Sequence, residues 1–250
     1  MPNPMKRPKR QRPSRFDPRI LYVVGALVLL IGLIILATKF SKSPIVATTE
    51  ESVAPRILDG IPPEGTGGDP DLNRQKNRAS LPKKLDEYDV DQIIALRHNL
   101  LDPQGRKHRT EFSGESQKYL ESMESIGARL TGYLIYAKES GLESCNGRID
   151  SLRDYHIWIG ATPTADKQHS VVVEMTPRWK RIHPEWRLRY LERLALDHPQ
   201  VRVSGWLLWD EEHASEVGRS RGSQWEVHPV TSFEVFTNNL WRTLSSDRAS

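Results

Sequence analysis

The chain has 250 residues, enough for one or two domains, and its formal net charge is +4 at pH 7. The basic excess is local, because residues 1–19 hold seven Lys or Arg residues and a single acid. Residues 43–250 hold 27 basic and 31 acidic residues, so this part of the chain is net acidic. The overall charge therefore gives no support to nucleic acid as a partner, which we regard as disfavoured.

Residues 20–38 form an uncharged apolar run, ILYVVGALVLLIGLIILAT. Its length is close to the ~20 residues that a helix needs to cross a bilayer, which predicts one transmembrane helix. A cleavable signal peptide is the alternative, but its apolar region usually has ~7–15 residues and ends in a small-x-small site. The length of the run favours an uncleaved, single-pass signal anchor in the cytoplasmic membrane, with the lipid bilayer as partner.

The basic residues before this run predict its orientation, because positive charge stays on the cytoplasmic side of a membrane. We expect residues 1–19 to be a disordered cytoplasmic tail and the chain beyond residue 40 to be extracytoplasmic. Residues 39–84 are rich in Pro and Gly and poor in apolar side chains, which predicts a disordered linker.

Residues 85–125 are expected to form a helical extension. Apolar spacing predicts one helix over 89–101, with Asp89 as its N-cap, and a second over 115–125. The region 126–240 then carries five strand patterns, with one helix from Pro184 to Pro199 between the third and the fourth. These strands are predicted at 128–137, 155–161, 170–176, 201–210 and 225–236. Residues 241–250 are expected to be a C-terminal tail.

The order β-β-β-α-β-β is typical of a five-stranded OB-like Greek-key barrel, so the predicted fold class is mainly β with helices. An open five-stranded α+β sheet with the same order is the alternative. Gly132 lies in the middle of the first strand, where a bulge would fit. Pro229 predicts a bend or an interruption in the last strand, because proline cannot donate to a ladder.

Several segments of the β region resemble a group of largely uncharacterised bacterial proteins with secreted or membrane-anchored domains. The resemblance covers residues 126–236 and is carried by E-S-C-N-G-R, D-Y-H-I-W-I, V-V-V-E-M-T-P-R, V-S-G-W-L-L-W-D-E-E-H and W-E-V-H-P-V. It is strongest at 205–206, 210–213 and 225–230, the last of which fits a W-E-[IV]-H-P-V motif. The resemblance implies a bacterial origin and an OB-like fold, and it implies no particular activity.

Polar residues near the strand ends are candidates for a metal site. Period-two spacing places Glu226 and His228 on one face of the last strand, as it does Asp154 and His156 on the second. Two histidines and a carboxylate suffice to bind a divalent transition metal, and an open coordination position would permit hydrolysis. The candidate ligands are His156, Glu174, His213, Glu226 and His228. The alternative is a structural role, because no H-E-x-x-H or similar spacing fixes a site, and we otherwise expect no cofactor.

Four tryptophans form a second candidate site for a ligand. An exposed aromatic face could stack a sugar or a base, although packing in the core is the alternative for such residues. The candidates are Trp158, Trp206, Trp209 and Trp225. Basic residues at 178–193 could meet an anionic partner, such as a surface polymer, although a solvated helix face is the simpler interpretation.

The sequence contains no G-x-S-x-G elbow and no phosphate-binding glycine loop, and its lone Cys145 lacks an evident histidine partner. The favoured function is therefore a membrane-anchored, extracytoplasmic binding or interaction module, without enzymatic activity. Its partner would be an anionic surface polymer or an envelope protein, contacted through the polar loop at 211–224. A metal-dependent hydrolase is one alternative, and an oligonucleotide- or oligosaccharide-binding domain is another. The sequence leaves the oligomeric state open.

Overall fold

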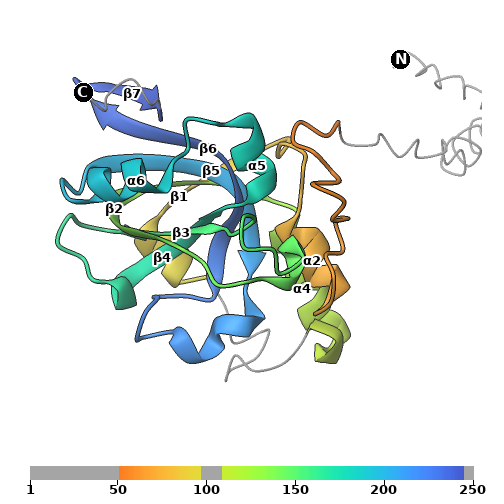
Figure 1. Ribbon diagram of the computed structural model, residues 1–250. Helices are drawn as coiled ribbons and strands as arrows, with labels where there is room; N and C mark the ends of the chain where they lie inside the picture. The colour runs from red at the N-terminus through yellow and green to blue at the C-terminus, as the bar shows by residue number, and fades with distance from the viewer. Residues whose placement is uncertain (1–50, 97–108, 245–250) are drawn as a thin grey trace, which may run out of the picture. The chain divides into compact units, whose positions relative to one another are not determined.

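A five-stranded β-barrel is the centre of the computed structural model, which describes residues 51–96 and 109–244 (Figure 1). Its strands are β2 (Gly127–Glu139), β3 (Tyr155–Gly160), β4 (Ser170–Met175), β5 (Gln200–Trp209) and β6 (Trp225–Thr237). They lie in the order β2-β3-β4-β6-β5, and β5 pairs back onto β2 to close the barrel. Only the β4–β6 pair among these five is parallel. The closed mixed barrel is consistent with the predicted OB-like barrel, and the open-sheet alternative is wrong.

Alternation along the strands fills the barrel interior with apolar side chains. Ile157 and Ile159 of β3 and Val171 and Val173 of β4 belong to the main hydrophobic core and are fully buried. Their neighbours in sequence point to the other face of the sheet, because side chains alternate along a strand. His156 lies on that outer face and is also buried, so another part of the chain must cover it.

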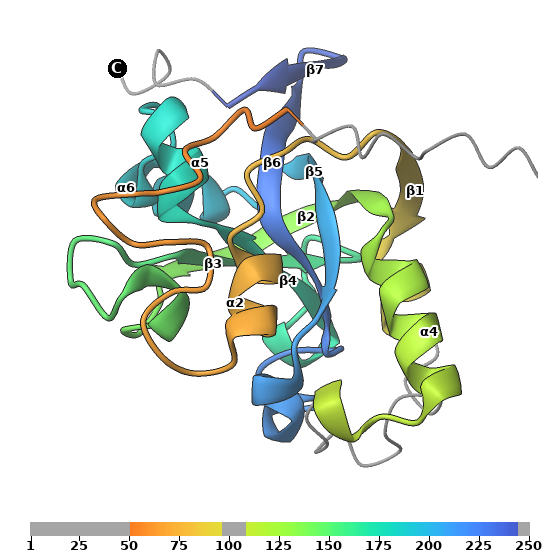
Figure 2. The ribbon, with the colours of Figure 1, turned by 90° about the vertical axis from the view of Figure 1, so that its right-hand side faces the viewer.

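Residues 51–84 provide part of this cover. They contain an α-helix, α2 (Pro70–Lys76), whose N-cap Asp69 accepts hydrogen bonds from two backbone N–H groups. Figure 2 shows α2 in front of the barrel, with the preceding chain looping beside it on the left. The prediction of a disordered linker is thus wrong for residues 51–84, and residues 39–50 lie outside the described residues. Composition misled because a few buried apolar side chains, such as Leu58, Ile61 and Leu72, combine with polar contacts to hold this segment.

The buried guanidinium of Arg178 makes several of these contacts. It donates to Asn77 Oδ1 at 2.8 Å and to the carbonyls of Ile61 and Pro62 at 3.0 Å each. Trp206 adds another, because its indole N–H donates to the carbonyl of Ser80 at 3.0 Å. These bonds join residues 61–80 to the barrel, and the bond to Asn77 gives a buried amide oxygen a donor.

The predicted N-terminal helices are present, but the first is short. Strand β1 (Leu85–Asp89) pairs in parallel with β2, and α3 (Val90–Ile94) starts at the capping box of Asp89 and Gln92. Asp89 is the N-cap, as predicted. The helix ends at Ile94, and residues 97–101 of the predicted helix lie outside the described residues. The second predicted helix is α4 (Gly114–Glu124), capped by Ser113.

Two helices, rather than one, join β4 to β5. They are α5 (Pro177–Ile182) and α6 (Leu188–Ala195). Pro177, and not Pro184, opens a helix, because it follows β4 directly and its fixed φ suits the first helical position. Leu191 of α6 is fully buried against the barrel.

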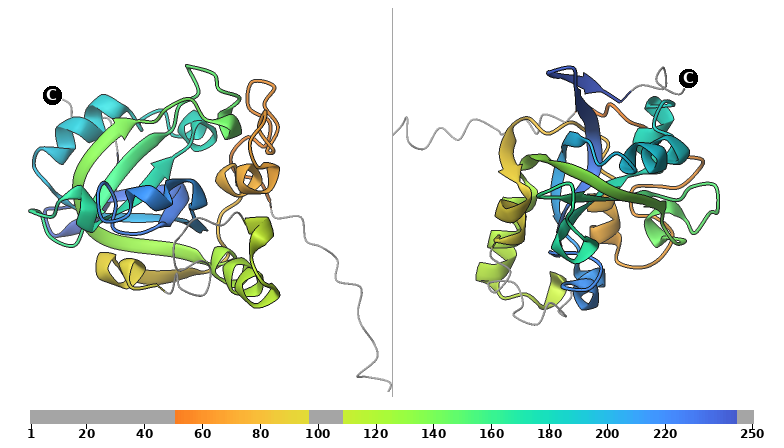
Figure 3. Two further views of the ribbon diagram at one scale, coloured as in Figure 1. Left: turned by 90° about the horizontal axis from the view of Figure 1, so that it is seen from below. Right: turned by 90° about the vertical axis from the view of Figure 1, so that its left-hand side faces the viewer.

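The last strand extends beyond the barrel. Strand β7 (Leu240–Thr243) pairs with β6 as a hairpin that projects from one end of the barrel in Figures 2 and 3, so the predicted tail begins as a strand. The β5–β6 register shifts around Gly205, which pairs with Val230 next to Pro229, and this agrees with the predicted irregularity at this proline. The irregularity in β2 lies between Leu134 and Tyr136 rather than at Gly132.

No helix in the stretches 51–96 and 109–244 is long and apolar enough to cross a membrane. The predicted transmembrane helix at 20–38 and the basic tail at 1–19 fall outside the described residues.

Candidate functional site

A cluster of charged side chains occupies the outer face of the barrel. Its floor is formed by strands β3, β4 and β6, where His156 pairs across the ladder with Glu174. Three other segments cover this floor: the connection between β2 and β3, the end of α2, and the connection between β5 and β6. The cluster is shielded from bulk solvent, because five of its side chains are each at most 2% exposed: Asp154, Glu174, Asp210, Glu226 and His228.

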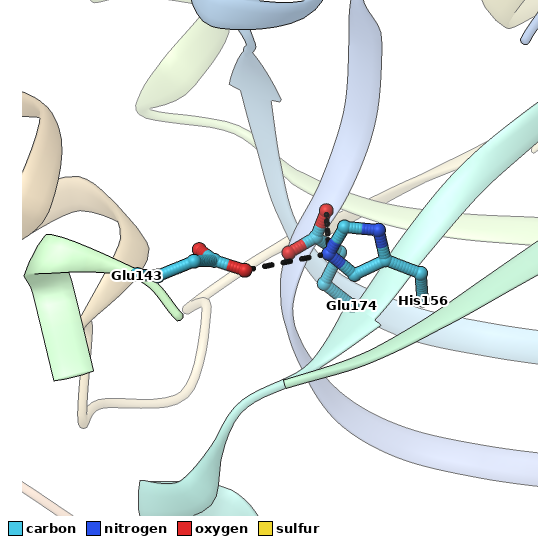
Figure 4. A group of neighbouring side chains, drawn as sticks. All are labelled: Glu143, His156 and Glu174. Carbon is cyan, nitrogen blue, oxygen red and sulfur yellow. Dashed lines mark ion pairs between the residues drawn. The ribbon is translucent and has the colours of Figure 1, made fainter. Parts of the chain in front are cut away.

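Glu143, His156 and Glu174 form the first centre of this cluster (Figure 4). The Nε2 atom of His156 lies 3.2 Å from Glu174 Oε1 and 3.4 Å from Glu143 Oε1. Glu143 reaches the strands from the β2–β3 connection, and its carboxylate points toward the same ring nitrogen. One donor atom from each of the three residues lies within 4.8 Å of the other two.

These distances match those between neighbouring ligand atoms around a bound metal ion. Zinc bonds of ~2.0–2.1 Å at tetrahedral angles place neighbouring ligand atoms about 3.3 Å apart. His156 Nε2 is buried and makes no hydrogen bond in proper geometry with any described residue, although two carboxylates lie so close. In the absence of a metal, a protonated His156 forms ion pairs with both carboxylates at these distances. The same spacing suits three ligands of a shared cation.

Glu174 also faces a second histidine. Its Oε2 lies 3.1 Å from Nδ1 of His228, which is itself 3.0 Å from Glu226 Oε1. Glu226 Oε2 lies 3.1 Å from Nη1 of Arg221, and the same Nη1 donates to Asp210 at 3.0 Å. A continuous chain of charged groups therefore runs from β4 through β6 into the β5–β6 connection.

Asp210 and His213 form an Asp–His pair at the end of this chain. Nδ1 of His213 bonds to Oδ2 of Asp210, and its ring stacks edge-on to His156 with centroids 6.4 Å apart. Asp210 is fully buried, whereas the side chain of His213 is 28% exposed. Lys76 of α2 approaches the same region, with its Nζ 2.9 Å from Glu212 and 3.7 Å from Glu143.

Burial and crowding shift the pKa values of these groups strongly. Burial raises the pKa of Asp154 to about 8, and the neighbouring charge of Glu143 adds to the effect. Burial alone would lower the pKa of His156, but Glu174 and Glu143 outweigh it and raise the value to about 10. Burial opposes the ionisation of Glu174 as well, yet His156 and His228 hold its pKa well below the usual range. The cluster thus attracts positive charge.

All five predicted ligands lie in this cluster, but they do not form one coordination shell. His156 and Glu174 belong to the first centre, and His228 and Glu226 lie on the far side of Glu174. His213 pairs with Asp210 instead of with the carboxylate of Glu174. Glu143 was not among the predicted ligands. Its only indication in the sequence is that the E-S-C-N-G segment closely precedes the strand of His156.

The four predicted stacking tryptophans do not share a surface. Trp209 and Trp225 pack edge-on inside the core, with ring centroids 5.2 Å apart, and Trp206 lies beneath the guanidinium of Arg78. Trp158 donates its indole N–H to the carbonyl of Ser220 at 2.5 Å. All four are at most 5% exposed, so packing rather than ligand stacking accounts for them.

The predicted contact surfaces are also partly buried. In the loop at 211–224, Glu211, Arg221, Ser223 and Gln224 are buried, because this loop covers the charged cluster. Arg178 is fully buried as well and takes no part in an exposed basic patch.

A comparison of the sequence with known protein families and with curated proteins finds no match. The resemblance to bacterial membrane-anchored domains therefore stays a prediction, and the charged cluster is the feature from which a function can be argued.

Proposed function

We propose that this protein is a metal-dependent hydrolase, in which Glu143, His156 and Glu174 hold a divalent transition metal, with zinc as the best fit. The spacing of their donor atoms, 3.2 and 3.4 Å around His156 Nε2, is the observation that carries the proposal. One imidazole and two carboxylates also suit manganese and iron(II).

Three protein ligands leave a coordination position for water, as in catalytic zinc sites. A metal in such a site activates water for attack on a carbonyl or phosphoryl centre. His213 lies beside His156 and is partly exposed, so it can accept or deliver a proton there, while Asp210 fixes its orientation. This pair provides proton transfer next to the metal ligands.

The charge at the exposed edge of the cluster indicates which class of substrate could approach it. Glu212 and Glu216, with side chains 50% and 41% exposed, contact Lys76 and His213 at this edge. An acidic edge repels polyanions and favours neutral or cationic substrates. Esters and amides are therefore better candidates than nucleic acids.

An OB-fold assignment supports the same location. If β2 to β6 are the five strands of an OB fold, ligands are expected on the face of the second and third strands and at loops 1–2 and 4–5. His156 and Glu174 lie on those two strands, and Glu143 and His213 lie in those two loops. This support is an analogy at the level of the fold.

Metal analysis of the full-length protein, purified in detergent, tests the proposal. We expect bound zinc after reconstitution and turnover of model esters or amides. His156→Gln and Glu174→Gln should lose the turnover and should bind less zinc than the wild type. His169→Gln is the matched control, because the side chain of His169 is 72% exposed and pairs with Asp166 instead. Wild-type protein without stoichiometric metal would contradict the proposal.

A second candidate is a binding module that is tethered by residues 20–38 and stabilised by a structural metal. The depth of the cluster favours it, because His156 is only 8% exposed and Glu174 only 2%. In that case, zinc binds and raises the stability of the fold, but no ester, amide or phosphodiester is turned over.

A further inference from the structure

Three buried polar atoms beside the first centre make no hydrogen bond with any described residue. They are Asp154 Oδ2, Glu174 Oε2 and His228 Nε2. Their residues are 0%, 2% and 0% exposed, so bulk solvent does not reach these atoms. A buried donor or acceptor without a partner costs about 1–3 kcal/mol, and three in one place need a common explanation.

The three residues are also close enough to share a ligand. One donor atom from each of Asp154, Glu174 and His228 lies within 4.8 Å of the other two. The other carboxylate oxygen of Asp154, Oδ1, already has a partner, because it accepts a hydrogen bond from Asn146 Nδ2 at 2.9 Å. Asp154 is thus held in place by one oxygen while the other is left for a partner.

His228 is oriented in the way that metal-bound histidines are. Its Nδ1 lies 3.0 Å from Glu226 Oε1, and Glu226 is held in turn by Arg221. A carboxylate that accepts Nδ1–H fixes the tautomer in which Nε2 carries the lone pair, and this arrangement recurs behind metal-ligating histidines. Nε2 is the atom of His228 that has no partner in the described part of the chain.

We propose that Asp154, Glu174 and His228 bind a second divalent transition metal, and that the Glu174 carboxylate bridges it to the first. Oε1 of Glu174 faces His156 Nε2 at 3.2 Å, whereas Oε2 lies 3.1 Å from His228 Nδ1 and makes no hydrogen bond with a described residue. Carboxylate-bridged pairs place two metals ~3.5–4 Å apart and clamp both the attacking and the leaving group in hydrolysis.

The charges of the cluster favour a pair of cations. When His156 and His228 are neutral, as metal-ligating histidines must be, five carboxylates share the cluster with only two permanent cations, Lys76 and Arg221. The carboxylates are Glu143, Asp154, Glu174, Asp210 and Glu226. Burying unbalanced carboxylates is costly, and two divalent ions would compensate them more fully than one. This inference rests on the proposed function, because it adds a metal to the same site.

Metal stoichiometry separates the two proposals. Full-length protein is loaded with zinc, freed of excess metal and analysed by mass spectrometry for metal per chain, with circular dichroism as the check on folding. We expect two zinc ions in the wild type and in His169→Gln. One ion should remain in Asp154→Asn and in His228→Gln, and neither in Glu174→Gln. Asp154→Asn keeps the shape of the side chain, so it remains informative if His228→Gln does not fold.

A second readout uses manganese, because two Mn(II) ions that share a carboxylate are magnetically coupled and an isolated ion is not. The paramagnetic resonance spectrum of wild-type protein should show the coupled pair, and Asp154→Asn should show isolated Mn(II). A single metal that is lost in His156→Gln and kept in Asp154→Asn would overturn the second site and leave the proposed function standing. Wild-type protein that binds no metal overturns both.

Discussion

Arg178 donates a hydrogen bond of 2.8 Å to Asn77 and so joins the start of α5 to the residue that follows α2. Both side chains are buried, and the two residues are 101 positions apart in the chain. This contact fixes residues 51–84 over the charged cluster. Without that cover, Lys76 could not reach Glu143 and the floor of the cluster would face solvent.

Arg178→Met should therefore destabilise the fold. It removes four hydrogen bonds from a charged donor and leaves the buried Asn77 Oδ1 short of a partner, at a cost of about 3 kcal/mol. The free energy of unfolding from urea titration measures this loss. Arg181→Met is the control, because its pair with Asp59 is half exposed, and it should change stability by less than about 0.5 kcal/mol. Equal effects of the two variants would contradict the role of Arg178.

Gly205→Ala should distort the pairing of β5 with β6. A Cβ atom at Gly205 would collide with the carbonyl oxygen of Pro229 and would lie 2.7 Å from Val227 Cγ1. A backbone atom cannot move aside as the end of a flexible side chain can, so we expect the free energy of unfolding to fall by about 3 kcal/mol. Gly141→Ala is the matched control, since a Cβ there meets no described atom within 4 Å, and it should leave the melting temperature nearly unchanged. A wild-type melting temperature in Gly205→Ala would show that the strands can separate at this point.

Trp209→Ala should act on stability, because Trp209 packs against Trp225 inside the core. Truncating a buried tryptophan leaves a large cavity and costs about 3–5 kcal/mol. Trp241→Ala is the comparison, because Trp241 is only partly buried on β7, and it should cost about 1 kcal/mol. Denaturant unfolding followed by far-ultraviolet circular dichroism measures both. A fully stable Trp209→Ala variant would reopen the question of a ligand surface.

Cys145 should be unreactive in the folded protein. The residue is 1% exposed, and burial together with the charges of Asp154 and Glu143 raises the pKa of its thiol well above the usual range. We expect its reaction with an aromatic disulfide reagent at pH 8 to be at least ~100-fold slower than in urea, which requires an opening free energy of only about 3 kcal/mol. Comparable rates in the two conditions would mean that the β2–β3 connection opens readily, and with it the position of Glu143.

The strands could be predicted because their signal is local. Alternating apolar residues and the proline and glycine boundaries placed all five barrel strands within a few residues, and the order of elements was sufficient for a barrel. The linker prediction for 51–84 was wrong because Asn73, Lys76 and Asn77 are buried and contact distant residues through hydrogen bonds and ion pairs. Composition does not contain such partners.

The candidate site divides in the same way. The sequence by itself determined that His156, Glu174, Glu226 and His228 lie on barrel strands, since period-two spacing assigns their faces. Only the tertiary structure decided that the outer face is covered, that Glu143 reaches it from the β2–β3 connection, and that Glu174 lies between two histidines. The physical reason is that a strand pattern specifies the direction of a side chain. What that side chain meets depends on chain closure and on segments brought over it from far away in the sequence.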